Sequence, residues 1–283
     1  MQRVAIIGAG ELGGAIADAL ARRDVARAIL LVDERGPIAA GKALDIAQSA
    51  PIAGFASQLT GASDVSMAAG ADVVVVADRA GRGEWQGEEG LALLTRVIGS
   101  ARAAIIVCAG AMQRDLVERG GGELGIDRAR IFGSAPEALA GGARALAALA
   151  VNGSPRDISL SVLGVPPHHT VIPWADATIG GLALTRLVDE PARRRLMARV
   201  GALWPPGPYA LAAAAASALD AMTGRTRRFV SCFVAPDLFV EEGGRRARTG
   251  AMPVRLGAQG IVGVLTPTLS QAERIALETA LAL

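Results

Sequence analysis

The sequence VAIIGAGELG occupies residues 4–13, and AILLVD occupies residues 28–33. Each stretch contains an apolar run of strand length, and the apolar residues between them recur at the spacing of a helix with one buried face. Gly8 permits a tight turn after the first strand, Gly10 lets a pyrophosphate approach the backbone, and Gly13 lets the helix pack closely on the sheet. The sequence therefore predicts a dinucleotide-binding βαβ unit, with the pyrophosphate at the helix N-terminus.

Asp33 ends the second apolar run, 20 residues after Gly13, where a ribose-binding acid is expected. Asp33 and Glu34 would repel a 2′-phosphate, so the sequence predicts NAD rather than NADP. Arg35 alone favours NADP, and it is also explained as an ordinary surface arginine. The alternative for the whole motif is a simple glycine turn followed by a solvated loop acid. The residues expected to contact the cofactor are Gly8, Gly10, Glu11, Leu12, Gly13, Asp33 and Ala77.

The composition fits a globular protein with a large core. The chain has 283 residues, of which 51% are hydrophobic and 20% charged, enough for one large or two medium domains. The formal charge is +2 and the basic residues are dispersed, so no nucleic-acid partner is expected. The two cysteines lie in apolar runs without metal-ligand spacing, which predicts a reduced, cytoplasmic protein without a metal site. No signal peptide or bilayer-spanning run is found, so no membrane partner is expected.

Further strands continue the pattern of the first βαβ unit. Buried apolar runs at residues 71–77, 104–108 and 130–133 alternate with helical stretches, which predicts a doubly wound parallel sheet. Beyond about residue 145 the pattern changes to longer helices and antiparallel-type strands. We therefore predict an α/β fold with an NAD-binding Rossmann domain at residues 1–145 and an α+β substrate-type domain at residues 146–283.

Local signals place several elements more closely. Residues 41–46 predict the start of a helix, followed by a turn-rich stretch at residues 49–55. In the second half, two helices are expected, one opened by Asp189 and running to about Trp204 and one from about Tyr209 to Thr223. Strands are expected at 228–234, 252–257 and 261–265, and a capping box of sequence SQAE at 270–273 opens the last helix.

Four segments together resemble the lactate/malate dehydrogenase superfamily, closest to its lactate-dehydrogenase-like malate dehydrogenases. They are the glycine turn at residues 8–13, Asp33, the sequence GKALD at 41–45 and the sequence SAPIAGF at 49–55. Residues 252–263 extend the resemblance over nearly the whole chain, which is shorter than is usual for the family. The resemblance implies NAD as cofactor, a Rossmann domain followed by a substrate domain, and a homodimer or homotetramer.

The resemblance also implies positions for catalytic side chains. In the family one arginine clamps the substrate carboxylate, a second polarises its carbonyl, and a histidine paired with an aspartate moves the proton. Arg82 matches the arginine with which malate dehydrogenases select a second carboxylate. The polarising arginine corresponds to Glu88, and the asparagine that contacts nicotinamide corresponds to Ala109 or Gly110. A family glycine corresponds to Arg79, which would either bind phosphate or block the cofactor.

The remaining catalytic positions are also altered. The aspartate and the clamping arginine correspond to Leu139 and Gly142, and the catalytic histidine corresponds to Pro167. His168 misses that position by one residue, and a local insertion would place His168 or His169 there. We therefore predict Arg82 and His168 as the catalytic candidates and expect ordinary malate and lactate activity to be absent or very low. The alternative for His168 is a loop histidine without a catalytic role.

Two functions follow from these observations. The first is an oxidoreductase that transfers hydride between NAD and a small 2-hydroxy/2-oxo carboxylate other than malate or lactate. The second is a catalytically inactive NAD-binding relative that acts by binding. In both cases, the glycine-interrupted segment at residues 81–90 is expected to stay open or mobile when NAD is bound.

Overall fold

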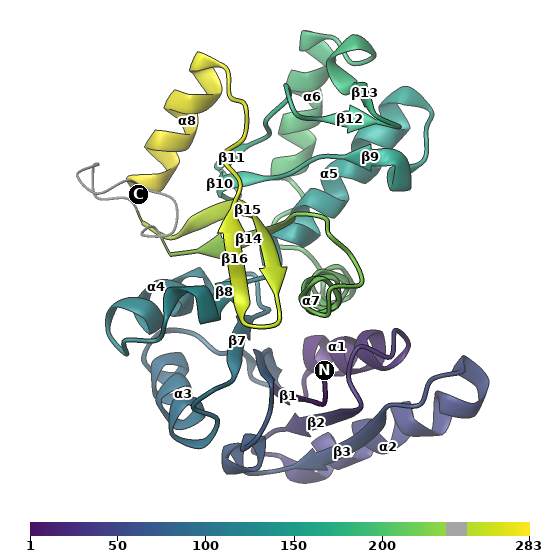
Figure 1. Ribbon diagram of the computed structural model, residues 1–283, viewed down its shortest axis with the longest axis vertical. Coiled ribbons are helices and arrows are strands. Elements are labelled where there is room, and N and C mark those ends of the chain that lie inside the picture. Colours follow the sequence, from purple (N-terminus) through teal and green to yellow (C-terminus); the bar gives the residue numbers. More distant parts are fainter. Residues whose placement is uncertain (236–247) are drawn as a thin grey trace.

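The computed structural model describes residues 1–235 and 248–283. Its N-terminal half is built on six strands, β1 (Arg3–Ile7), β2 (Ala28–Val32), β3 (Gln58–Ala62), β4 (Val73–Val76), β7 (Ile105–Cys108) and β8 (Ile131–Gly133). They are ordered β3-β2-β1-β4-β7-β8, and all neighbours are parallel (Figure 1). This order is that of a doubly wound dinucleotide-binding sheet. The predicted α/β Rossmann fold is therefore confirmed.

Helices connect the strands of this sheet. They are α1 (Glu11–Ala21), α2 (Gly36–Ala53), α3 (Gly87–Ser100), α4 (Arg114–Gly122) and α5 (Ala135–Val151). Every residue of β4 and β7 is buried, as expected for parallel strands covered on both faces. The apolar runs of the sequence therefore form the centre of the sheet.

The second half of the chain extends the same sheet with antiparallel strands. β14 (Val230–Val234) pairs with β8, and the sheet continues through β15 (Gly250–Gly257), β10 (Leu163–Val165) and β11 (His169–Val171), with β16 (Gly260–Val264) beside β15. A small separate sheet has the order β13-β12-β9, formed by Leu182–Ala183, Thr178–Ile179 and Ile158–Ser159. Because the large sheet is continuous and α5 crosses residue 145, the domain boundary there stays a prediction.

The helices of the second half agree with the sequence signals. They are α6 (Glu190–Gly201), α7 (Pro208–Met222) and α8 (Gln271–Leu281). Asp189 caps α6 by accepting a hydrogen bond from the Ala192 amide, and Ser270 and Glu273 form the predicted capping box of α8. Among the described residues, none of the helices is long and apolar enough to cross a bilayer.

The prediction of a turn-rich stretch at residues 49–55 is wrong. α2 continues through Pro51 to Ala53 and is capped by Gly54, whose φ of 77° is left-handed. Pro51 lies in the last turn of the helix, so the hydrogen bond that it cannot donate is lost only near the helix end. The proline and glycine therefore mark the end of the helix and not a separate turn.

Among the residues that the structure describes, the buried apolar side chains form two clusters. The larger joins the parallel sheet to α7, β14 and β15, whereas the smaller gathers residues of α5 and α6 with residues 158–188. Trp204 is partly buried and packs against both clusters, and its ring meets Phe233 edge to face at 6.1 Å. The two halves of the chain are therefore held together by apolar packing as well as by the shared sheet.

Candidate functional site

The glycine turn between β1 and α1 has the geometry that the sequence predicts. Gly8 has a φ of 114°, a backbone conformation that residues with a side chain rarely adopt. A methyl group at Gly13 would overlap the carbonyl oxygen of Gly8, so only glycine allows α1 to begin this close to the strand. The amides at the start of α1 are thereby presented at the carboxyl end of the sheet, where ligands bind in open α/β folds.

The carboxylate of Asp78 takes hydrogen bonds from these amides. Gly13 donates to Oδ1 over 2.9 Å and Leu12 donates to Oδ2 over 3.3 Å, while the Gly10 amide donates to the backbone oxygen of Asp78 over 2.9 Å. A methyl group on Gly10 would overlap the Asp78 carboxylate. A negative charge is favourable at a helix N-terminus, so this contact is stabilising. The position expected for a pyrophosphate therefore holds a carboxylate of the chain itself.

Asp33 is buried at the end of β2, with only 5% of its surface exposed. The amides of Ala9 and Ala80 donate to Oδ2 over 2.8 and 2.9 Å, and the amide of Arg35 donates to Oδ1 over 3.0 Å. Burial raises the pKa of Asp33, but the three backbone hydrogen bonds outweigh it, so the pKa lies below its usual value. The alternative of a solvated loop acid is therefore wrong.

A short hairpin follows β4 and begins with Asp78. β5 (Asp78–Arg79) pairs with β6 (Gly83–Glu84), and Gly81 and Gly83 have φ values of 73° and 77°. Gly81 and Gly83 thus shape a hairpin, while Gly87 and Gly90 lie in α3, and the expectation of an open or mobile segment in the presence of NAD stays a prediction. Arg82, at the turn, is exposed and pairs with Glu34 over 3.3 Å.

Glu84 fixes the far end of the hairpin. Its carboxylate accepts hydrogen bonds from the amides of Ala111 and Met112 over 3.0 and 2.9 Å. A methyl group on Gly110 would overlap this carboxylate, so Glu84 occupies the space beside one of the two positions predicted for the family's asparagine. Burial raises the pKa of Glu84 above its usual value, the two backbone hydrogen bonds oppose this, and the charge of Asp78 raises it further.

Because its pKa is raised by folding, Glu84 stabilises the protein most when it is protonated. Stability from this group is fully present below its unfolded pKa and is lost as the pH rises through its folded pKa. We therefore expect Glu84→Gln, which stays neutral, to gain stability relative to the original protein as the pH rises from about 4 to about 7. Urea unfolding of both proteins across this range measures the difference. A stability difference between Glu84→Gln and the original protein that stays constant or falls as the pH rises would contradict a raised pKa of Glu84.

Trp85 follows the hairpin and is buried, with 7% of its surface exposed. The Arg79 guanidinium lies 4.4 Å from the centre of its ring and pairs with Glu89 over 2.6 Å. Trp85 also lines a residual cavity of about 10 Å³ beside Asp33, at the ends of β1 and β2. Arg79 is therefore held by Glu89 and Trp85, and it contributes to the site by fixing Trp85.

Comparison with known proteins assigns the chain to a family. The profile of the lactate/malate dehydrogenase NAD-binding domain matches residues 2–162, more than half of the chain. The chain belongs to this family. A malate dehydrogenase from Salinibacter ruber is 28% identical over 304 aligned residues, which cover 98% of this chain and 93% of the relative. An L-lactate dehydrogenase from Geotalea daltonii is 28% identical over 313 residues, covering 97% and 95%.

Solved structures of the lactate/malate dehydrogenase family have the same fold. The malate dehydrogenase of Salinibacter ruber superposes with a TM-score of 0.83 at 24% identity, covering 99% of this chain and 94% of that chain. A Cryptosporidium parvum lactate dehydrogenase in complex with lactic acid and NAD superposes with a TM-score of 0.85 at 22% identity, with the same coverage. The chain is thus an NAD-binding lactate/malate dehydrogenase-type oxidoreductase by family, and NAD is the cofactor of this family's domain.

The predicted catalytic positions of this dehydrogenase relative do not form a polar cluster. Glu88 is at the surface and pairs with Arg119 over 2.8 Å. Leu139 is buried with 1% exposure, and a methyl group at Gly142 would overlap the side chain of Leu203. Leu139 therefore lies in the apolar core, and Leu203 lies against Gly142, which also borders a cavity lined by Arg144 and Arg228.

Within the described residues, no hydrogen bond or ion pair joins either catalytic candidate to the glycine turn. His168 is exposed next to the cis Pro166–Pro167 bond, and in the described part of the chain no hydrogen bond or ion pair joins it to another residue. Arg82 is bound to Glu34, beside Asp33. The structure does not bring the two candidates into contact with each other, and their catalytic roles stay predictions.

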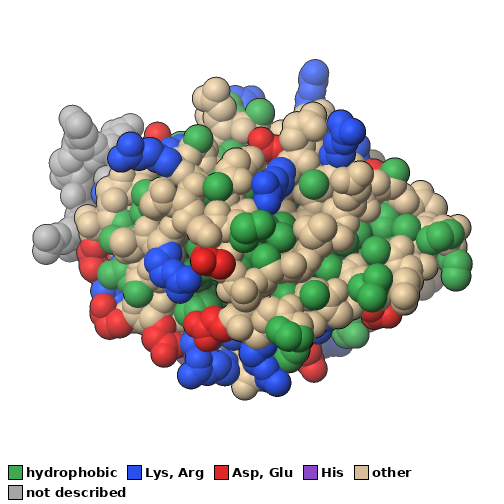
Figure 2. Space-filling model, turned by 90° about the horizontal axis from the view of Figure 1, so that it is seen from below, with side chains coloured by type: hydrophobic (Ala, Val, Ile, Leu, Met, Phe, Trp, Pro, Cys, Tyr) green, Lys and Arg blue, Asp and Glu red, His purple; other side chains and the backbone are tan. Residues whose placement is uncertain are grey.

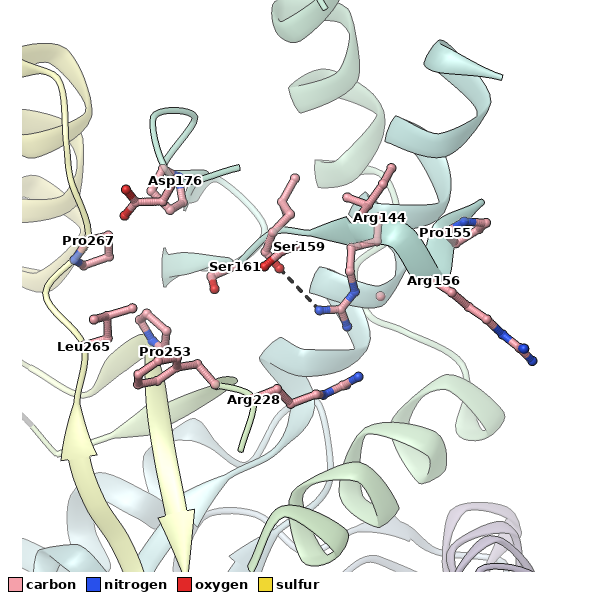
Figure 3. A pocket seen from close by; sticks show the side chains of 15 residues that line it. Arg144, Pro155, Arg156, Ser159, Ser161, Asp176, Arg228, Pro253, Leu265 and Pro267 are labelled. Atoms are coloured by element: carbon pink, nitrogen blue, oxygen red, sulfur yellow. Dashed lines mark hydrogen bonds between the residues drawn. The ribbon is translucent and has the colours of Figure 1, made fainter. Parts of the chain in front are cut away.

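A large cavity lies elsewhere, between α5 and the strands of the second half. It has a volume of about 630 Å³, and Arg144, Arg156 and Arg228 line it together with Asp176 (Figure 3). A second cavity of about 400 Å³ lies between α5 and α7 and is lined by Gly142 as well as by Arg144 and Arg228. Neither cavity is lined by the predicted cofactor contacts, by Arg82 or by His168, whereas Gly142, the position predicted for the clamping arginine, borders the second.

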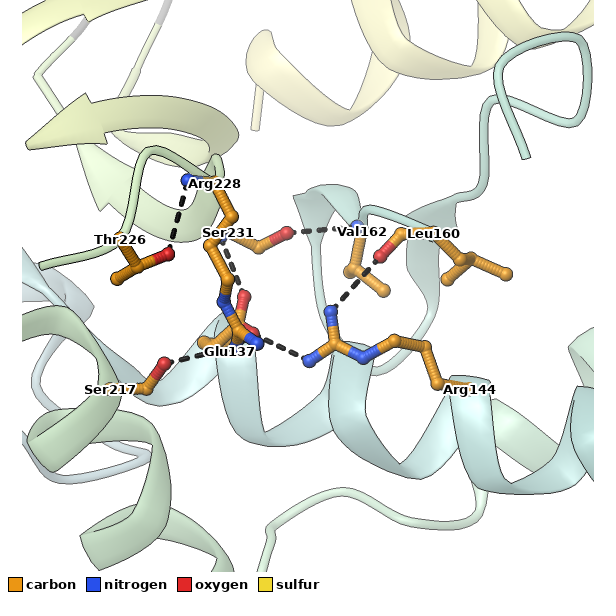
Figure 4. Close-up of polar contacts among 8 residues, drawn as sticks. All are labelled: Glu137, Arg144, Leu160, Val162, Ser217, Thr226, Arg228 and Ser231. Atoms are coloured by element: carbon orange, nitrogen blue, oxygen red, sulfur yellow. Dashed lines mark hydrogen bonds and ion pairs between the residues drawn. The ribbon is translucent and has the colours of Figure 1, made fainter. Parts of the chain in front are cut away.

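Glu137 links the two arginines that these cavities share, and sequence reasoning missed it. Its carboxylate is 3% exposed, pairs with Arg144 and Arg228, and accepts a hydrogen bond from the Ser231 amide over 2.9 Å (Figure 4). The signal in the sequence was an acid within an otherwise apolar helix, with an arginine two turns later. Burial of a charge requires such partners.

The described conformation does not fit NAD as it stands. The amides of Leu12 and Gly13 at the start of α1 donate to Asp78, and Asp33 accepts hydrogen bonds from three backbone amides. Trp85 lines the small cavity beside Asp33. The residue types of the family's cofactor site are present, but side chains of this chain hold the contacts. Any NAD-bound state requires that these contacts be exchanged.

Proposed function

We propose that this chain is a divergent NAD-binding member of the lactate/malate dehydrogenase family that has lost the malate and lactate reactions and acts by binding. The observation that carries the proposal is the surrounding of Gly142, the position predicted for the arginine that clamps the substrate carboxylate. Leu203 fills the adjacent space, and Leu139 is buried in the apolar core. Leu203 restricts access of a carboxylate to this position, and the two arginines that line the adjoining cavity, Arg144 and Arg228, are already paired with Glu137.

A second candidate function is oxidation or reduction of another small 2-hydroxy/2-oxo carboxylate. It is supported by the cavity of about 400 Å³ between α5 and α7, which reaches Gly142 and contains the guanidinium groups of Arg144 and Arg228. Both arginines share the single charge of Glu137, so the group of three retains a net positive charge. Such a cavity is large enough for a small carboxylate.

Turnover measurements decide between these functions. We expect the purified protein with NADH to reduce oxaloacetate and pyruvate far more slowly than ordinary enzymes, which reach about 1–1,000 per second, because each lost catalytic group costs about 100-fold or more. The assay follows NADH absorbance, with a Salinibacter ruber malate dehydrogenase as the positive control. Oxaloacetate turnover in the ordinary range would defeat the proposal, whereas turnover of a different 2-oxo acid would support the second candidate.

We also propose that the protein is a cytoplasmic homo-oligomer. Figure 2 shows hydrophobic side chains among polar ones over much of the face seen from below, on the side where α2 lies in Figure 1. In α2, Leu44 and Ile52 are 60% and 92% exposed, and exposed apolar groups of this kind are frequent at protein–protein contacts. The cytoplasmic location is supported by two free, buried cysteines, Cys108 and Cys232. Light scattering during gel filtration measures the oligomeric state.

A further inference from the structure

Residues 78–85, called here the 78–85 segment, lie in the groove where the Rossmann fold presents its cofactor contacts. The segment engages two of these contacts, the amides at the start of α1 and Asp33, and it is also held by two amides after β7. Asp78 accepts hydrogen bonds from the amides at the start of α1, the Ala80 amide donates to Asp33, and Glu84 accepts from the amides of Ala111 and Met112 after β7. These contacts extend from the glycine turn to Asp33 at the end of β2 and to the residues after β7, the strand beside β4 in the sheet.

At the glycine turn, the carboxylate of Asp78 takes the place of a phosphate group. It supplies two anionic oxygens to the amides of Leu12 and Gly13, which are the groups that bind a pyrophosphate in this fold. It also fills the space over Gly10 that the absence of a side chain leaves free. The same amides cannot bind both anions, and a pyrophosphate beside the carboxylate would be repelled. Binding of the two is therefore mutually exclusive.

At the other end of the groove, Trp85 fills the space beside Asp33. The residual cavity there is about 10 Å³, whereas ligand pockets usually measure about 300–1,000 Å³. Burial of a large aromatic ring stabilises this position. The indole Nε1 of Trp85 is nevertheless buried without a hydrogen-bond partner among the described residues, and so is the Nε of Arg79 above its ring. These unsatisfied donors disfavour the docked position and make its displacement easier.

We propose that the 78–85 segment is an intramolecular competitor of NAD. In the NAD-free protein it occupies the cofactor groove, and NAD binds only to molecules from which the segment has moved away. The apparent affinity for NAD is then the intrinsic affinity multiplied by the fraction of molecules with an open groove. The inference concerns the cofactor groove alone, so it holds whether or not the bound state is catalytic.

Calorimetric titration of NAD into the original protein and into Asp78→Ala tests the proposal. Alanine removes the carboxylate and keeps the backbone contact of residue 78 with Gly10. We expect NAD to bind Asp78→Ala about 10- to 100-fold more tightly, because two hydrogen bonds to a charged group no longer hold the groove closed. The matched control is Asp189→Ala, which removes the carboxylate at the N-terminus of α6 and should leave NAD affinity unchanged. Equal affinities of the original protein and Asp78→Ala would overturn the proposal.

A second measurement keeps the side chain of Asp78 intact. The chain has three tryptophans, so Trp174→Phe combined with Trp204→Phe leaves Trp85 as the only one. On addition of NAD, emission from Trp85 should move to longer wavelength as the ring leaves its buried position. Binding of NAD without such a shift would overturn the proposal. Absence of NAD binding by both the original protein and Asp78→Ala would overturn it together with the NAD assignment, whereas turnover of oxaloacetate bears only on the proposed function.

Discussion

Replacement of Glu137 by alanine is expected to lower the free energy of unfolding by about 3–5 kcal/mol, because the substitution removes one partner of a buried ionic group. Glu137 is 3% exposed, and its Oε1 is shared by Arg144 and Arg228 (Figure 4). Arg144 is itself only 18% exposed, so alanine at position 137 would leave its charge largely desolvated. Urea unfolding at neutral pH measures the loss.

The backbone contact of Glu137 adds to this effect. Oε2 accepts a hydrogen bond from the buried amide of Ser231, and the Ser231 hydroxyl in turn accepts one from the amide of Val162. The side chain therefore joins α5 to β14 and, through Ser231, to the segment that leads into β10. A buried amide that loses its acceptor costs about 1–3 kcal/mol.

Two controls separate the buried charge from general effects of substitution. Asp18→Ala removes an exposed ion pair with Arg22 and should cost no more than about 1 kcal/mol. Arg144→Met in the Glu137→Ala background should recover part of the loss, since it removes the unpaired charge and fills space. A loss in Glu137→Ala as small as that in Asp18→Ala would show that the pairing is not a major stabilising interaction.

Much of the fold was predictable because the parallel sheet depends on local patterns. The runs that form β1, β2, β4 and β7 are continuous, apolar and bounded by turn residues, so their type and order follow from the sequence. The errors lie where a local signal is ambiguous. Pro51 and Gly54 predict a turn, yet a helix tolerates proline in its last turn when a left-handed glycine ends it.

The site was less predictable, because its contacts join residues far apart in the chain. The glycine turn and Asp33 belong to a motif with fixed spacing and are recognisable. Asp78 binds amides 65 and 66 positions away, and Glu84 binds amides 27 and 28 positions away, so neither contact has a local pattern. An acid directly after β4 was visible in the sequence, but only the structure shows that its carboxylate meets the start of α1.

Replacement of Asp33 by alanine is expected to lower the free energy of unfolding by about 2–4 kcal/mol at neutral pH, because three backbone amides lose a charged acceptor. Two of them, those of Ala9 and Ala80, share Oδ2 and connect the glycine turn to the 78–85 segment. Since folding lowers the pKa of Asp33, its contribution is present above the unfolded pKa and is lost as the pH falls through the folded pKa. The free energy of unfolding of the original protein should therefore exceed that of Asp33→Ala by less below about pH 4 than at neutral pH. An excess that grows as the pH falls would contradict this account.

The same carboxylate should determine cofactor preference once the groove is open. A ribose hydroxyl can replace the Ala80 amide at Oδ2 of Asp33, whereas a 2′-phosphate would be repelled by Asp33 and by Glu34 beside it. In the Asp78→Ala background, NADH should therefore bind more tightly than NADPH. Adding Asp33→Ala should reduce this preference about 10- to 100-fold, because a hydrogen bond to a charged group contributes about 1.5–3 kcal/mol. Titration of both cofactors into both variants gives the ratio. The Arg35 guanidinium lies 3.5 Å from the backbone oxygen of Ala80. Equal affinities for NADPH and NADH while Asp33 is intact would show that Arg35 binds the 2′-phosphate after the segment moves.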